Sequence, residues 1–264
     1  VVGWHPSTWL WGFTLIWGIL NYPHARALIL GQMATVVFLA TYLSLLFLKR
    51  SWDWAAGVVL AMTTIKPQMS FLIVPWLLWW SGWKSRWRVW KGFALAIGIL
   101  VGISFVLVPT WLSDFLIGLR RYDVVSGTDY HSLTWIILRH FLGLSPVVKA
   151  MGVAAFCVVA AWLIWRERRA NWPRFLWSTG LILILTNFIA PRTATTHYSM
   201  LLLPLFDWFS STLDRWTRRR AAFIVTVEAS LLIGQWAVFL ATIQGDYETA
   251  AVYLPFPLLL LFIA

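Results

Sequence analysis

Residues 54–82 read WAAGVVLAMTTIKPQMSFLIVPWLLWWSG, and Lys66 is the only charged residue in this stretch. An apolar run of this kind is typical of segments that cross or enter a bilayer, because a spanning helix needs about 20 apolar residues. Lys66-Pro67-Gln68 divides the run into two limbs. Since an ionisable side chain at membrane depth is costly and usually functional, this triplet is the first candidate for a functional site.

The composition of the whole chain also indicates a lipid environment. Of the 264 residues, 60% are hydrophobic and 12% are charged, whereas a soluble protein is about 25% charged. We therefore expect an all-α polytopic integral membrane protein in which residues 1–264 form a single transmembrane helical domain of about ten transmembrane or re-entrant helices. The expected segments cover residues 8–21, 32–48, 54–66, 68–83, 92–109, 148–165, 175–190, 199–213, 221–243 and 250–264.

The basic residues are distributed unevenly along these segments. If the segments alternate in direction, one set of loops holds 14 of the 21 lysines and arginines, and the opposite set holds seven. Basic loops stay on the cytoplasmic side, so Lys66 and the residues near 192 fall on the extracytoplasmic side. Because membrane topology accounts for the net charge of +11, we expect the bilayer as a partner and no nucleic acid.

The two limbs of residues 54–82 are expected to form a hairpin with Lys66 at its turn. Pro67 favours a turn because it disfavours helical geometry at the preceding residue. The first limb spans about 20 Å of a hydrocarbon core about 30 Å thick, so the turn is expected in a cavity below the outer surface. An ammonium group there needs an anionic partner such as a phosphate. The alternative is a lysine at a helix end that extends to the interface.

A second polar segment, Pro191-Arg192-Thr193-Ala194-Thr195-Thr196-His197-Tyr198, lies between two apolar segments. Such groups are costly near hydrocarbon unless they line a polar cavity. Arg192 suits phosphate because a guanidinium group holds two oxygens in a fork, and His197 is able to donate or relay a proton. The alternative is a polar external turn with an incidental histidine.

A long extracytoplasmic loop is expected at about 110–147, longer than most loops that lack a function. Its first part, residues 111–119, is amphipathic and suited to lie along the membrane surface. Its second part contains Asp123, Asp129 and His131, the kinds of group that bind a polyol. An ordinary solvated loop remains the alternative. Gln32 is a weaker candidate, since it is also able to hydrogen-bond a neighbouring helix.

Several function classes lack their usual motifs. We find no glycine-rich nucleotide loop and no His-Glu-x-x-His sequence. The single cysteine, Cys157, argues against a disulfide framework and a cysteine-based metal site within this chain. The extracytoplasmic acids are able to hold a divalent ion, but no ligand spacing argues for one, so metal dependence stays open. Asp207 and Glu228 lie within apolar segments and keep a transporter as an alternative.

Taken in order, several short motifs resemble glycosyltransferase family 87, within the glycosyltransferase C (GT-C) superfamily. That family includes polyprenyl-phosphate-mannose-dependent mannosyltransferases. The motifs that carry the resemblance are Leu30-Gly31-Gln32, Lys66-Pro67-Gln68, Leu72-Ile73-Val74-Pro75-Trp76, Trp83-Lys84-Ser85-Arg86-Trp87-Arg88, Ala190-Pro191, His197-Tyr198 and Leu201-Leu202-Leu203-Pro204.

The resemblance implies a GT-C-type, multi-pass enzyme of the cell membrane with its active site on the extracytoplasmic side. It would transfer a sugar, often mannose, from a polyprenyl-phosphate donor to a glycolipid or glycan acceptor of the envelope, with no cofactor besides that donor. The residues expected at the donor phosphate are Lys66, Arg192 and His197, supported by Gln68 and Tyr198. The residues expected at the acceptor or sugar are Gln32, Asp123, Asp129 and His131.

The chain departs from the family pattern at its beginning. The resemblance places a catalytic aspartate in the first external loop, well upstream of the Gly-Gln motif, whereas this chain starts at Val1, close to Gly31. We therefore expect an amino-terminally incomplete chain and assign no catalytic base. The competing hypotheses are a transporter or flippase for a lipid-linked sugar or another anionic amphiphile, and a membrane scaffold.

Overall fold

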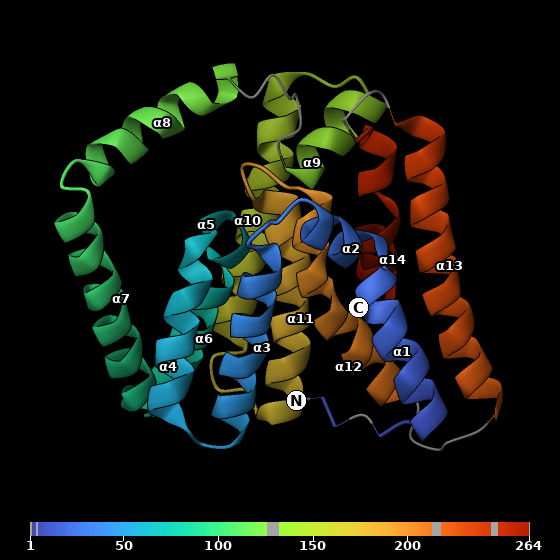
Figure 1. Cartoon of the computed structure of the whole chain (residues 1–264), viewed down its shortest axis with the longest axis horizontal. Coiled ribbons are helices and arrows are strands. Elements are labelled where there is room, and N and C mark those ends of the chain that lie inside the picture. Colours follow the sequence, from blue (N-terminus) through green and yellow to red (C-terminus); the bar gives the residue numbers. More distant parts are fainter. Residues whose placement is uncertain (1, 4, 126–131, 213–217, 244–247, 264) are drawn as a thin grey trace.

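A computed structural model describes residues 2–3, 5–125, 132–212, 218–243 and 248–263. Every regular element within these ranges is a helix, and most helices run between the lower end and the upper half of the molecule as drawn in Figure 1. The longer helices are α1 (Thr8–Leu20), α2 (Tyr22–Ile29), α3 (Ala34–Lys49), α4 (Asp53–Met62), α6 (Ile73–Trp83), α7 (Trp87–Leu107), α8 (Trp111–Val125), α10 (Pro146–Arg166), α11 (Trp172–Ile189), α12 (Leu202–Thr212), α13 (Arg218–Thr242) and α14 (Pro255–Ile263). The short helices are η1 (Thr63–Ile65), α5 (Pro67–Ser70), α9 (Leu133–Trp135), η2 (Ile136–Phe141), η3 (Thr195–Leu201) and η4 (Ala250–Tyr253).

Three helices, α7, α10 and α13, are long and apolar enough to cross a membrane. Four shorter apolar stretches accompany them, at Thr8–Leu20, Ala34–Lys49, Asp53–Ile65 and Ala250–Ile263. The sequence therefore predicted an all-helical membrane protein correctly. Each of the ten expected segments contains a helix, but several are too short or too broken to count as full spans by length alone.

The expected segment 68–83 is one such broken segment. Its first part forms α5, which ends at Ser70, and α6 begins only at Ile73. Pro75 explains this start, because proline lacks an N–H group and its ring clashes with the carbonyl group one turn earlier, so it is tolerated in the first turn of a helix. Pro67 likewise occupies the first position of α5.

Helix α2 was missed by the sequence analysis, which left residues 22–31 between two segments. The side chain of Asn21 accepts a hydrogen bond from the backbone N–H of His24, and Pro23 lies in the first turn. This pairing of an N-cap residue with an early proline is a recognised helix start. The signal was present, although a search for long apolar runs does not detect it.

Helix α11 is the centre of the core. Most of its residues from Phe175 to Ile189 are buried, and they contribute to two adjoining clusters, one with α3, α4 and α6 and one with α1, α12, α13 and α14. Trp76 on α6 lies against Phe175 with a centroid separation of 5.6 Å, and its indole N–H donates to the Thr179 hydroxyl at 2.9 Å. The core therefore fixes the position of α6 and of the turn before it.

Helix α7 contacts the rest of the molecule mainly near its beginning. A Cβ atom on Gly57 would lie 2.0 Å from the carbonyl oxygen of Val89, and one on Gly92 would lie 2.5 Å from that of Trp54. Glycine at both positions lets the backbones of α4 and α7 approach closely, as small residues do between membrane helices. Beyond this crossing α7 continues to α8, which forms an arm at the top of Figure 1. The predicted amphipathic segment 111–119 lies in α8.

The two sets of loops separated by the charge count lie in different parts of the molecule. The α3–α4, α6–α7 and α10–α11 connections and the start of α13 gather at the lower end of Figure 1. The α2–α3 connection, α5 and the chain before η3 lie in the upper half. Lys66 and the polar segment 191–198 are therefore found in the same part of the fold, as the alternating arrangement predicted.

Candidate functional site

The candidate site begins at Gly31 and Gln32, directly after α2. The N–H of Gly31 donates to the carbonyl oxygen of Leu28 at 3.1 Å, and the N–H of Gln32 donates to that of Ala27 at 2.8 Å. Gly31 has φ = 59°, a left-handed conformation that glycine adopts without strain and that commonly ends a helix. The Gly-Gln motif therefore terminates α2 and holds Gln32 in a defined position before α3.

Lys66 and Thr196 converge on the side chain of Gln32. The Lys66 ammonium group donates to Gln32 Oε1 at 2.7 Å, and the Thr196 hydroxyl donates to the same oxygen at 2.8 Å. Lys66 lies between η1 and α5 with φ = −125° and ψ = 80°, the non-helical geometry that a following proline favours. The three residues belong to segments far apart in the sequence, so tertiary folding alone creates this cluster, which we call the Lys66 cluster.

Burial lowers the pKa of Lys66 to about 8. An ammonium group in a partly dehydrated site loses favourable hydration, and its neutral form becomes easier to reach. At pH 7 the group is still a cation. It has three N–H donors, of which Gln32 takes one, so donors remain for a ligand.

His197, on η3 next to Thr196, is buried. Its Nδ1 accepts a hydrogen bond from the backbone N–H of Ala194 at 3.3 Å, which leaves Nε2 to carry the proton of the neutral ring. Burial, together with the positive charge of Lys66, lowers the pKa of His197 well below its ordinary value. The imidazole is thus a neutral hydrogen-bond donor beside the Lys66 cluster.

A second polar network surrounds Glu248, which precedes η4. Its Oε1 accepts from the Tyr22 hydroxyl at 2.7 Å and from the Thr195 hydroxyl at 2.6 Å, and the carboxylate forms an ion pair with Arg26. Because Thr195 and Thr196 are consecutive, η3 connects this Glu248 network to the Lys66 cluster. Glu248 was not among the site residues predicted from the sequence, since no local pattern marks it.

The other predicted donor-site residues are spread around these networks. Arg192 is partly buried in the connection from α11 to η3, and Gln68 is partly buried in α5. Tyr198 is fully buried, and its hydroxyl donates to the Tyr253 carbonyl oxygen at 2.9 Å, so the structure orients it toward η4.

Of the three acceptor residues predicted in the long loop, only Asp123 belongs to a described element. The backbone of Asp123 belongs to α8, and its side chain lies outside what the structure describes. Asp129 and His131 lie outside the described residues. Within the described ranges, no group of three or more His, Cys, Asp and Glu side chains is placed to hold a metal ion.

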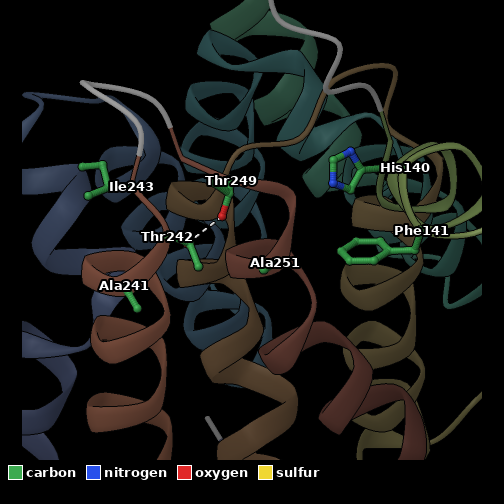
Figure 2. Close-up of a pocket in the computed structure, with 7 residues that line it drawn as sticks. All are labelled: His140, Phe141, Ala241, Thr242, Ile243, Thr249 and Ala251. Atoms are coloured by element: carbon green, nitrogen blue, oxygen red, sulfur yellow. Dashed lines mark hydrogen bonds between the residues drawn. The ribbon is translucent and has the colours of Figure 1, made fainter.

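An open cavity of about 460 Å³ lies beside the Glu248 network (Figure 2). Thr249, the residue after Glu248, donates from its hydroxyl to the Thr242 hydroxyl at 2.6 Å. Figure 2 shows His140 and Phe141 pointing from η2 toward these two threonines. The volume falls within the range of about 300–1,000 Å³ that is usual for small-molecule sites.

The two acids of the apolar segments have different surroundings. Glu228 on α13 is fully buried, and both of its oxygens accept from the Thr14 hydroxyl on α1, at 2.9 and 3.2 Å. Asp207 on α12 lines a cavity of about 130 Å³ together with aromatic and aliphatic side chains. Thr14 thus gives Glu228 a hydrogen-bond partner inside the fold. The sequence alone did not identify this partner.

A comparison with known protein families identifies the family of this chain. The model of glycosyltransferase family 87 matches residues 2–190. The chain belongs to glycosyltransferase family 87. This family 87 protein is therefore a glycosyltransferase, and its long apolar helices make it a membrane protein. The match includes Gln32 and Lys66 and ends before Thr196, His197 and Glu248. No curated protein and no solved structure matches the chain significantly.

Proposed function

We propose that this family 87 protein transfers a hexose, in the first instance mannose, from a polyprenyl-phosphate donor to a lipid-linked or other envelope acceptor. The observation that carries the proposal is the Lys66 cluster. A partly buried lysine, the Gln32 oxygen that accepts from it, the threonine that donates to the same oxygen and a neutral histidine gather at one part of a fold built from apolar helices. A lipid phosphate combines the charge and the apolar tail that such a place accommodates.

The donor phosphate would lie against the free N–H groups of Lys66 and the Nε2–H of His197. When the bond between the anomeric carbon and the phosphate oxygen breaks, negative charge builds up on the departing polyprenyl phosphate. Fixed cationic and neutral donors stabilise that charge more in the transition state than in the ground state. Arg192 is suited to add a bidentate contact, with Gln68 close to Lys66 in the chain, whereas the hydroxyl of Tyr198 is engaged by η4.

The reaction is an inverting displacement in which the acceptor oxygen attacks the anomeric carbon from the face opposite the phosphate. A base takes the acceptor proton, the new C–O bond forms, and polyprenyl phosphate leaves with its bonding electron pair. None of the described carboxylates is assigned as that base. The proposed reaction uses the lipid-phosphate-sugar donor as substrate and involves no further cofactor.

The proposed orientation is multi-pass with the site on the extracytoplasmic side. Its support is the position of the basic loops at the end of the molecule away from Lys66, since basic loops favour the cytoplasm. The cavity in Figure 2 is the proposed place of the acceptor saccharide. Hydroxyl groups from Thr242 and Thr249 suit a polyol, and Phe141 offers an apolar face to a sugar ring.

The test is sugar transfer by membranes that contain the full-length protein. Radiolabelled polyprenyl-phosphate mannose is offered with several acceptor extracts, and a labelled sugar nucleotide is offered in parallel. We expect label to move only from the lipid donor, and we expect Lys66→Ala and His197→Ala to lower the rate of transfer about 100-fold or more at unchanged protein level. Transfer from the sugar nucleotide, or full activity of both variants, would contradict the proposal.

A further inference from the structure

The lower end of the molecule carries a separate collection of cations and indoles. The α6–α7 and α10–α11 connections meet there, because the Lys84 ammonium group donates to the carbonyl oxygen of Arg169 at 3.0 Å. Trp79 on α6 lies 6.3 Å from Trp165 on α10, measured between ring centroids. Two loops that the charge count grouped together are thus joined in space.

Within this contact, guanidinium groups lie over indole rings. Arg168 lies 4.3 Å from the ring centroid of Trp165 and 5.1 Å from that of Trp83, and Arg169 lies 4.8 Å from Trp83. Such contacts hold a cation in place while leaving its outward N–H groups available. We call Trp83, Lys84, Trp165, Arg168 and Arg169 the indole–cation cluster.

The nearby carboxylates are bound by other arginines. Both oxygens of Glu167 accept from Arg174 at 2.8 Å, and Asp53 forms an ion pair with Arg86. Within the described part of the chain, no carboxylate forms an ion pair with Lys84, Arg168 or Arg169. The cluster therefore presents an excess of positive charge that the protein itself does not neutralise.

An apolar surface adjoins the cluster on α10. The side chains of Val158, Val159 and Trp162 are exposed, by 69%, 47% and 54%. They lie in α10, which is long and apolar enough to cross a membrane. Exposed indoles prefer the headgroup level of a bilayer, and aliphatic side chains prefer its acyl region. The cations would thus face the phosphate of a phospholipid, the indoles its headgroup region and the aliphatic side chains its acyl chains.

We propose that the indole–cation cluster is a binding site for an anionic phospholipid, with the headgroup phosphate on Lys84, Arg168 and Arg169. The acyl chains would lie along Val158, Val159 and Trp162. Arginine suits phosphate because its planar fork contacts two oxygens, and basic groups at a membrane surface attract anionic lipids. This site is distinct from the Lys66 cluster and does not depend on the proposed reaction.

Arg88 and Lys91 provide a matched control. Both are exposed near the start of α7, at the same end of the molecule, and for neither does the structure record an indole contact among the described residues. Removing these two charges changes the net charge as much as removing Lys84 and Arg169. A difference between the two double variants therefore reports the geometry of the cluster and not the overall charge.

The experiment measures thermal stability of the full-length protein in phosphatidylcholine bicelles titrated with phosphatidylglycerol. For wild type we expect a saturable rise in Tm. For Lys84→Gln/Arg169→Gln we expect an apparent affinity about tenfold weaker, and for Arg88→Gln/Lys91→Gln a change within about twofold. Equal loss in both double variants would show diffuse charge attraction and overturn the proposal, as would an equal rise in Tm on adding more phosphatidylcholine or inorganic phosphate.

Folding of the cluster variant is checked by its Tm in phosphatidylcholine alone. If that Tm falls well below the wild-type value, Arg169→Gln is compared with Arg88→Gln, because both side chains are exposed and each removes one arginine. Weaker phosphatidylglycerol binding by Arg169→Gln alone supports the site. Equal binding by the two single variants overturns it.

Discussion

The two ends of this molecule treat positive charge differently. In the upper half, Lys66 is partly buried and is held by one side-chain oxygen that Thr196 also contacts. At the lower end, Lys84 and Arg169 are exposed and are held by an indole ring and a backbone carbonyl group. The upper half therefore holds Lys66 by a side-chain hydrogen bond, whereas the lower end displays several cations at the surface.

This difference shows that the number of charges is a poor guide to the reacting site. An exposed cation keeps most of its hydration and costs little, so many can gather at a membrane surface. A buried cation loses hydration and persists where hydrogen bonds or a ligand compensate. Of the two lysines compared, Lys66 has the more restrictive surroundings and is therefore the better candidate for the donor phosphate.

The largest expected difference is between Lys66→Ala and Lys84→Ala. We expect Lys66→Ala to lower kcat/KM for the lipid-phosphate donor by about 10²–10³, the usual effect of removing one stabilising group from a developing anion. Lys84→Ala removes the same charge at the lower end and should change the value by less than about twofold. Initial transfer rates, normalised to folded protein, test this pair. Equal losses would remove the distinction between the two ends.

The next comparison uses two carboxylates that pair with arginine, Glu248 in the upper half and Glu167 at the lower end. Glu248→Gln loosens η3 and should reduce transfer about tenfold, the equivalent of one hydrogen bond to a charged group. Glu167→Gln breaks a similar contact to Arg174 at the lower end and should leave the rate per folded molecule within about twofold. Rates and Tm values are measured for both variants. A larger effect of Glu167→Gln on the rate would contradict a positioning role for Glu248.

The pH dependence of donor binding follows from the pKa of Lys66, which burial lowers to about 8. Lys66 is cationic below that pKa, so the KM for the donor should be flat near pH 7 and rise about tenfold per unit once the pH exceeds it. Lys66→Arg keeps its charge over the same range, since arginine does not deprotonate. If Lys66→Arg is active and its KM for the donor rises with pH as the wild-type KM does, the pH dependence belongs to another group.

The smallest expected effect concerns the cavity in Figure 2. Phe141→Ala should raise the KM for the acceptor by about three- to tenfold, the range for loss of one aromatic contact, without changing the KM for the donor. Phe105→Ala removes a similarly exposed ring on α7 and serves as the control. If both variants raise the acceptor KM equally, the cavity is not the acceptor site.

The sequence predicted the helical membrane class correctly and singled out Lys66 as a candidate, because both depend on local signals. A lone charge within an apolar run is visible without a structure. The lengths of individual helices were less predictable, since residues 54–83 are equally apolar on both sides of the breaks near Lys66 and before Ile73. Apolar composition shows that a segment is buried in protein or lipid but does not show whether it spans the bilayer.

The partners of Lys66 were harder to predict than Lys66 itself. Gln32 was expected near the acceptor or sugar. The sequence did not predict that its side-chain amide oxygen accepts a hydrogen bond from the Lys66 ammonium group, 34 positions away. Thr196 is separated from Gln32 by 164 positions, and Glu248 from Tyr22 by 226. Contacts over such separations depend on how α2, α5 and η3 pack, and one sequence carries no local pattern for them.

The most direct test of the central claim is equilibrium binding of radiolabelled polyprenyl phosphate to the full-length protein in nanodiscs that contain excess phosphatidylglycerol. The excess lipid occupies the indole–cation cluster, so binding reports the Lys66 cluster. We predict that Lys66→Ala weakens binding about 100-fold, equivalent to about 2.7 kcal/mol, and that Lys84→Ala leaves it unchanged. Wild-type affinity in Lys66→Ala, or loss of binding in Lys84→Ala alone, would contradict the assignment of the donor phosphate to Lys66.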